Sequence, residues 1–410
     1  MKLNTLWLES LLYASVAISI VFYKYEIAGF SVATWVAIPA FLFFSLKWLL
    51  AAAKTRRSHA FFDLLLIAIF FGLVWFSSAY NPLYAENIVS FLLRYIFFAT
   101  PLLFVLDRKK FNFAANLISA QTVIVCLALI MGGFGLIEFE SVRTESARFD
   151  IGVSEGRTTG ILGNFADYAM LASFAIFLTG YLVAIGKRSD KSLIVIVVIV
   201  VTSEFFAQSR NLIVTFACAS LVFAFATSYG SGKLAYKLIV LATVSTAAPI
   251  LFYLYIQYFE TLDYGRILQA KAALELIIDS PLIGHGANSF TVLTYFPWNV
   301  HNIILQLLVS GGLLALIPFF LCISLITYRL LRLTSTPKPF LAAIAVSILV
   351  SSMFYPALSS IIFWWLLGHL AAATLTLESN SRPTKVESEA LTLDPELEKP
   401  TTSHPALNRS

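Results

Sequence analysis

Charged side chains are scarce in this chain, and their scarcity excludes a water-soluble globular protein. Lys, Arg, Asp and Glu make up 12% of the 410 residues, whereas apolar residues make up 59%. The mean hydropathy of +0.83 is far above what a surface in contact with water tolerates. The sequence therefore predicts a protein that is dissolved in lipid.

Cysteine and recognisable metal ligands are also scarce. The chain has three cysteines, Cys126, Cys218 and Cys322, all inside apolar runs and none in a CxxC pair. Structural disulfides and thiolate zinc sites are therefore not expected. Glu138 and Glu140 could hold a divalent cation, but no DxD motif or histidine-bearing ligand set accompanies them. We expect neither a metal nor a cofactor.

Long apolar runs recur along the chain, each long enough to cross a hydrocarbon core of about 30 Å as a helix. We predict an all-α polytopic membrane protein with about twelve transmembrane helices. The first run has no small-residue cleavage site after it, which favours a retained helix over a signal peptide. The predicted spans are 6–23, 31–50, 60–78, 88–106, 114–136, 166–185, 193–208, 212–229, 238–258, 302–328, 339–355 and 359–377.

The segment after the last span differs sharply in composition. Residues 378–410 are rich in Ser, Thr, Glu and Pro, which cannot bury enough apolar surface to fold. The sequence therefore predicts one transmembrane domain, 1–377, followed by a disordered tail, 378–410.

The distribution of basic residues predicts the orientation. The even-numbered segments between spans contain fifteen Lys and Arg residues, and the odd-numbered segments contain seven. Because basic residues near span ends stay in the cytoplasm, we expect both termini, and the tail, to be cytoplasmic. The long odd-numbered segments, about 138–165 and 259–300, then face outward. The net charge of +5 follows this topology, so no nucleic-acid partner is expected.

Two arginines lie where an arginine is costly. Arg210 lies between two spans with almost no connecting loop, against the orientation bias. Its guanidinium could bind a lipid phosphate, or it could be an ordinary interfacial arginine; the residues alone leave both readings open. Arg94 lies within the fourth span, where a charge costs about 3 kcal/mol unless it is paired or hydrated. It could pair with Glu204 or contribute to a phosphate site.

The outward segment 259–300 has the clearest pattern. From Arg266 to Ile278 apolar residues recur at helical spacing, and Asp279, Ser280 and Pro281 end the run. This predicts a short amphipathic helix at the membrane surface, with Arg266 in its first turn, where an anion is favoured. The glycines around His285 predict a sharp turn, and the aromatic residues that follow are typical of a membrane interface: Phe290, Tyr295, Phe296 and Trp298.

A histidine and an asparagine open the next span. His301 could act as a general base, because an imidazole titrates near neutral pH, or it could anchor the helix with Asn302 as its polar partner. His285 fits a turn residue better than a base.

These residues together resemble a known family. The SR pair of the short hairpin is followed by GR, a helix that ends in DSPLIGHGANSF, and then VHNIILQLLVSGG. This order is similar to the O-antigen ligase and polymerase superfamily, with its D-x-P-x-x-G-x-G turn, its HN pair and its glycine-bearing span. The stretch GRTTGILGNFADYAMLASF also resembles the opening of the family's sixth span. The resemblance covers roughly residues 155 to 325.

The resemblance implies a reaction and a set of site residues. A glycan would move from undecaprenyl diphosphate to an acceptor hydroxyl on the periplasmic face of the bacterial inner membrane, without metal and with inversion. His301, Arg210 and Arg266 would be catalytic, and Arg94, Arg157 and Asn302 would contact substrate. The acceptor expected in a ligase of lipopolysaccharide biosynthesis is lipid A core.

Other functions stay open. Some polymerases of this superfamily carry a glycine eleven residues after an outward arginine, and Arg143, Arg148, Arg157 and Arg266 lack it. The sequence therefore favours a ligase over an O-antigen or exopolysaccharide polymerase, and a protein oligosaccharyltransferase is a further alternative. A transporter would instead show charges at the membrane midplane, broken helices and an inverted repeat, and no repeat is found.

Overall fold

The computed structural model describes the larger part of the chain. The described residues are 2–23, 25–27, 30–50, 56–80, 88–105, 108–137, 160–162, 164–207, 209–231, 264–294, 296, 299–333 and 336–378. The elements among them are almost entirely helical, and every predicted span except 238–258 coincides with a helix. Span 238–258, most of segment 138–165, and the tail after Glu378 lie outside the described residues.

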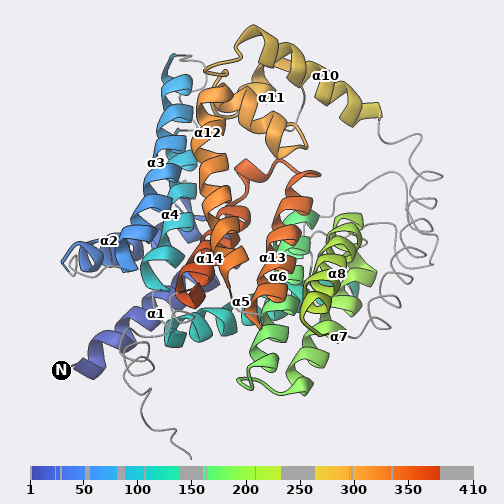
Figure 1. Ribbon diagram of the computed structural model, residues 1–410. Helices are drawn as coiled ribbons and strands as arrows, with labels where there is room; N and C mark the ends of the chain where they lie inside the picture. The colour runs from blue at the N-terminus through green and yellow to red at the C-terminus, as the bar shows by residue number, and fades with distance from the viewer. Residues whose placement is uncertain are drawn as a thin grey trace, which may run out of the picture.

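The described helices are labelled in chain order in Figure 1. Two two-residue strands, β1 (Glu26–Ile27) and β2 (Phe30–Ser31), form an antiparallel pair between α1 and α2. The helices are α1 (Lys2–Val21), α2 (Val32–Leu50), α3 (Arg56–Tyr80), α4 (Ile88–Phe104), α5 (Arg108–Gly133), η2 (Gly160–Leu162), α6 (Phe165–Ala184), α7 (Asp190–Ala207), α8 (Arg210–Ser231), α10 (Tyr264–Asp279), α11 (Ser289–Thr294), α12 (Ile303–Arg332), α13 (Pro337–Ser352), η3 (Ala357–Ser359) and α14 (Ile361–Glu378).

The composition of these helices is that of membrane spans. Within the described residues, six helices are long and apolar enough to cross a bilayer: α2, α3, α5, α6, α12 and α14. Apolar stretches of α1, α4, α8 and α13 are shorter. Many large apolar side chains on these helices are exposed, which water would not tolerate but lipid does. The described part of the chain is therefore that of a predominantly helical membrane protein.

Two helices form the centre of the bundle. Helices α6 and α14 are almost wholly buried, and the others surround them. Trp364 of α14 contacts Phe70 and Phe71 of α3 and Phe98 of α4 through their rings. Gly368 allows α4 to come close, since a Cβ there would lie 2.3 Å from the carbonyl oxygen of Phe98. The core is thus built on α14.

The two ends of the bundle differ. Helices α10 and α11 lie together at one end, and the N-terminus of the chain lies at the other (Figure 1). We call these the α10 end and the opposite end. Near the opposite end the buried carboxylate of Glu9 on α1 binds Lys47 of α2 and Lys110 of α5. This ion triad joins three helices.

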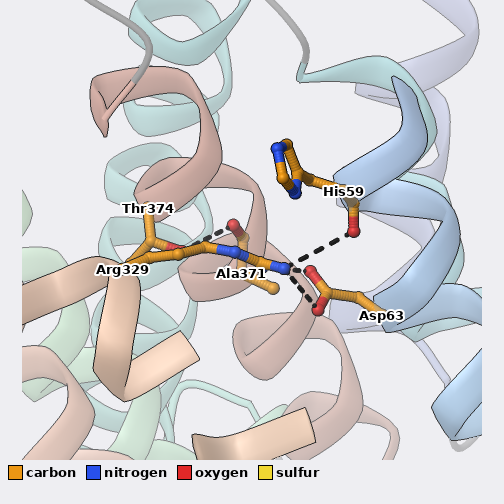
Figure 2. Close-up of polar contacts among 5 residues, drawn as sticks. All are labelled: His59, Asp63, Arg329, Ala371 and Thr374. Atoms are coloured by element: carbon orange, nitrogen blue, oxygen red, sulfur yellow. Dashed lines mark hydrogen bonds and ion pairs between the residues drawn. The ribbon is translucent and has the colours of Figure 1, made fainter. Parts of the chain in front are cut away.

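A second ion pair joins α3 and α12 (Figure 2). Asp63 is fully buried and Arg329 nearly so, and both nitrogens of the guanidinium fork bind the carboxylate. Arg329 also donates to the carbonyl oxygen of His59, 3.5 Å away. A buried charge keeps its place only when it is paired in this way. The carboxylate of Asp63 therefore holds α12 against α3.

Candidate functional site at the α10 end

The turn after α10 fills a break in α12. Gly312 has φ +62° and ψ −165°, so α12 consists of two helices that meet there. An unbroken helix would bond the amides of Leu313 and Leu314 to the carbonyls of Val309 and Ser310. Instead, the amides of Leu313 and Leu314 donate to the carbonyls of Pro281 and Leu282, at 2.9 and 3.1 Å. The carbonyls of Val309 and Ser310 accept from the amides of His285 and Gly286, at 2.7 and 2.9 Å.

The backbone amides and carbonyls at the break in α12 are therefore satisfied by hydrogen bonds to the turn after α10. A broken helix in a transporter exposes such carbonyls to an ion. Here the inserted turn already occupies Val309 and Ser310, so the break in α12 does not favour that reading.

The glycines of the turn allow this close approach. A Cβ on Gly284 would lie 2.7 Å from the backbone nitrogens of Gly311 and Gly312, and a Cβ on Gly286 would lie 2.7 Å from Cα of Ser78 on α3. Both glycines also have positive φ angles. The sharp turn that the sequence predicted is confirmed, and its purpose is backbone contact with α12 and α3.

His285 belongs to this scaffold. Its Nε2 lies 2.9 Å from the carbonyl oxygen of Leu276 in the last turn of α10, and 3.6 Å from the carboxylate of Asp279. Its backbone amide binds Val309 of α12. His285 thereby fixes the end of α10 against α12, in agreement with its interpretation as a turn residue.

His301 faces α10. Its Nδ1 lies 3.0 Å from Oε1 of Gln269, a buried residue on α10. Burial, and then the charge of Arg266 one turn earlier on the same helix, lower the pKa of His301 to about 4. The imidazole is therefore neutral at pH 7. Among the described residues, its Nε2 has no hydrogen-bond partner, so this nitrogen remains available to accept a proton.

Asn302 caps α12. Its Oδ1 accepts from the backbone amides of Ile304 and Leu305 at 3.0 and 3.1 Å, which satisfies two donors of the first turn. Its Nδ2 lies 3.8 Å from the sulfur of Met353, just beyond α13. The cap fixes where the helix begins and hence where His301 lies. The expected substrate contact of Asn302 stays a prediction, and only its Nδ2 is available for it.

Arg94 lies beside a buried cluster of hydroxyl groups around one carboxylate. Asp167, fully buried in the first turn of α6, accepts hydrogen bonds from Tyr23 at 3.3 Å, from Ser360 and from Tyr355. Arg94 is buried on α4, close enough to Tyr23 and Tyr355 to act on them electrostatically. The cluster brings α4 and α6 together with the end of α1 and the segment between α13 and α14.

Arg210 begins α8 at the same end. Its side chain lies outside the described residues, but its two neighbours in sequence fix the backbone. Ser209 caps α8 and donates to the carbonyl of Phe165 at 3.4 Å, and Asn211 donates to Ser351 of α13 at 2.8 Å. Arg157 lies outside the described residues.

One short segment connects these positions. Residues 351–360 run from the end of α13 to the start of α14, and they contact Asn211, Asn302, Asp167 and Gln306 through hydrogen bonds. The starts of α6, α8 and α12 therefore meet around this segment. The positions of Arg94, Arg210, His301 and Asn302, though distant in sequence, belong to one end of the bundle, and Arg266 is close enough to His301 to act on it electrostatically.

Sequence reasoning missed two parts of this site. Asp167 is a carboxylate inside an apolar span, so the same cost argument that singled out Arg94 could have found it. Gln269 gave no comparable signal, because an uncharged amide on an amphipathic helix is ordinary. Phe290, one of the aromatic residues expected near the membrane interface, is buried and stacks on Phe296 with ring centroids 5.8 Å apart, and its depth in the membrane stays a prediction.

The chemistry of the site depends on arginine, histidine and hydroxyl groups. Nowhere in the described residues do three His, Cys, Asp or Glu side chains gather as metal ligands.

No protein-family model and no curated protein sequence matches this chain.

Proposed function

We propose that this protein is a membrane glycosyltransferase that moves a glycan from a polyprenyl diphosphate to an acceptor hydroxyl at the α10 end. The observation that carries the proposal is the neutral imidazole of His301, whose Nε2 is available and which lies within electrostatic reach of the cation Arg266. Acid–base transfer to a diphosphate leaving group needs these two functions close together. The resemblance to the O-antigen ligase and polymerase superfamily supports the same reaction.

Each group has a role that follows from its chemistry. The acceptor hydroxyl attacks the anomeric carbon from the face opposite the diphosphate, and Nε2 of His301 takes the hydroxyl proton. The bond from the anomeric carbon to the diphosphate oxygen breaks, and negative charge grows on the diphosphate. The guanidinium groups of Arg266 and Arg210 stabilise this charge with paired hydrogen bonds. Inversion follows from the single displacement.

The charge distribution supports an outward-facing site. The basic residues Lys47, Lys110, Arg188 and Arg329 lie at helix ends remote from the α10 end, where they bind Glu9, Asn116 and Asp63. Since basic residues favour the cytoplasm, the α10 end would face the periplasm. A lipid-linked donor would then reach His301 from the outer leaflet of the inner membrane, and lipid A core is the acceptor we favour.

Surface polysaccharide reports the activity directly. In a strain lacking the gene, we expect plasmid-borne His301→Gln, Arg266→Lys and Arg210→Lys each to fail to restore the wild-type ladder on a gel. Loss of a ligase leaves long lipid-linked polymer unattached to core, whereas loss of a polymerase leaves core with a single repeat. The pattern therefore also decides the acceptor.

Matched controls separate a site defect from poor folding. His59→Gln changes an exposed histidine at the opposite end, and Arg332→Lys changes an exposed arginine there. Both should restore the ladder fully. Wild-type ladders from all three site variants at equal membrane levels would refute the proposal.

A further inference from the structure

The geometry around His301 points to a positioning residue on α10. Gln269 and Arg266 lie three residues apart on α10 and so are neighbours on its surface. Gln269 is 6% exposed, and Ala273, one turn further along, is fully buried against α12. Gln269 thus faces inward while Arg266 remains exposed. Gln269 contacts His301 directly, whereas Arg266 acts on it through its charge.

We propose that Gln269 orients His301 and fixes its tautomer, an inference that rests on the proposed role of His301 as a base. The amide oxygen of Gln269 can only accept a hydrogen bond, so the Nδ1 that faces it at 3.0 Å carries the proton. Nε2 is then left with its lone pair, which is the form a general base requires. Gln269 touches neither reacting group and acts through His301.

An amide suits this position better than the carboxylate that orients histidine in many hydrolases. A carboxylate beside His301 would form an ion pair with Arg266 and repel an approaching diphosphate. The neutral amide supplies the same hydrogen bond and leaves the charge of Arg266 for the donor. The structure thus assigns orientation to Gln269 and charge to Arg266.

The tautomer can be measured without any assay of activity. The full chain is purified into nanodiscs with ¹⁵N-labelled histidine, and the signal of His301 is identified by its loss in His301→Gln. At pH 7 we expect the Nδ1-protonated tautomer in the wild type and a shift toward the Nε2-protonated tautomer in Gln269→Leu. The Nε2-protonated form in the wild type, or an unchanged tautomer in Gln269→Leu, would overturn the inference.

A second variant tests the same hydrogen bond from the opposite direction. Gln269→Glu keeps the acceptor but adds a charge, so His301 should titrate at a higher pH in the same spectra. Glu275→Gln, an exposed change elsewhere on α10, should alter neither the tautomer nor the titration. A titration of His301 that does not move in Gln269→Glu contradicts the contact.

Kinetics then connects the tautomer with turnover. In a donor-transfer assay, Gln269→Leu should lower kcat by about 10- to 100-fold with little change in KM, and Gln269→Asn should recover part of it. If His301→Gln is fully active, the proposed function fails, yet the tautomer spectra still decide whether Gln269 holds Nδ1. A normal kcat in Gln269→Leu, with His301→Gln inactive, would refute the positioning role alone.

Discussion

A Cβ on Gly312 would lie 2.3 Å from the carbonyl oxygen of Leu282, so the two chain segments meet with no room for a side chain. Gly312 also adopts φ +62° and ψ −165°, a region that only glycine visits readily. The break in α12 and the turn after α10 therefore depend on each other. Since α10 carries Arg266 and Gln269 and α12 begins just after His301, this contact sets the geometry of the site.

Gly312→Ala should destabilise the protein strongly. The substitution forces both a strained backbone and a clash with Leu282, and we expect a loss of about 2 to 4 kcal/mol together with loss of activity. Thermal unfolding of the detergent-purified protein measures the first effect. Gly72→Ala is the matched control, because no atom lies within 4 Å of its added Cβ, and a helix favours Ala. Equal unfolding temperatures for the two variants would contradict this account of the break.

The pair of Asp63 and Arg329 should behave as a buried ion pair. Thr374, drawn with the pair in Figure 2, donates its hydroxyl hydrogen to the carbonyl of Ala371 in its own helix at 2.8 Å and not to Asp63. Asp63→Leu or Arg329→Leu alone leaves an uncompensated buried charge, and each should cost about 3 to 5 kcal/mol. Combining Asp63→Leu with Arg329→Leu should cost clearly less than the sum of the single changes.

Thermal unfolding of the single and double variants gives the coupling between the two residues. The exposed Arg332, only three positions further along α12, is the control, and Arg332→Gln should stay close to wild type. Strictly additive losses would mean that Asp63 and Arg329 do not stabilise one another.

The helices could be predicted from the sequence because their signals are local. Apolar runs fix the spans, and Asp279, Ser280 and Pro281 fix the end of α10, which the structure places at Asp279. The turn at Gly284 and Gly286 was likewise visible. None of these predictions depends on which helices pack against one another.

The rest of the site depends on contacts between distant segments. The pair Gly311 and Gly312 predicts that a helix can break there, but no local sequence signal predicts that residues 281–286 bind at the break. Gln269 becomes informative only once α10 lies over His301. Asp167 can be recognised as the centre of a cluster only from its hydrogen bonds to Tyr23, Tyr355 and Ser360, which are distant from it in sequence.

Asn302 offers a way to separate capping from substrate contact. Asn302→Asp keeps the oxygen that caps α12 and removes the NH₂ group, whereas Asn302→Ala removes both. We expect Asn302→Ala to cost about 1 kcal/mol in unfolding and Asn302→Asp to cost little. If the amide contacts the glycan or the diphosphate, Asn302→Asp should still lose activity in the ladder assay. A stable and fully active Asn302→Asp would confine this residue to capping.

The pH dependence of transfer should report the distance between His301 and Arg266. The base is active in its neutral form, so kcat/KM should stay constant from pH 8 down to about 5 and fall as the pH approaches the pKa of about 4. Arg266→Gln removes the cation that disfavours protonation of His301. The pKa should therefore rise, and the fall in kcat/KM should begin at a higher pH.

Arg266→Lys is the matched variant, because it keeps the charge but loses the planar fork. Arg266→Lys should reduce the rate but leave unchanged the pH at which kcat/KM falls. The two variants therefore separate the electrostatic effect of Arg266 on His301 from its hydrogen bonds to the donor.

A bound diphosphate should act on His301 as Arg266→Gln does, since its negative charge offsets the guanidinium. The fall in kcat, which reports the donor complex, should then lie at a higher pH than the fall in kcat/KM. Identical profiles for wild type and Arg266→Gln would place the two side chains too far apart for the proposed mechanism.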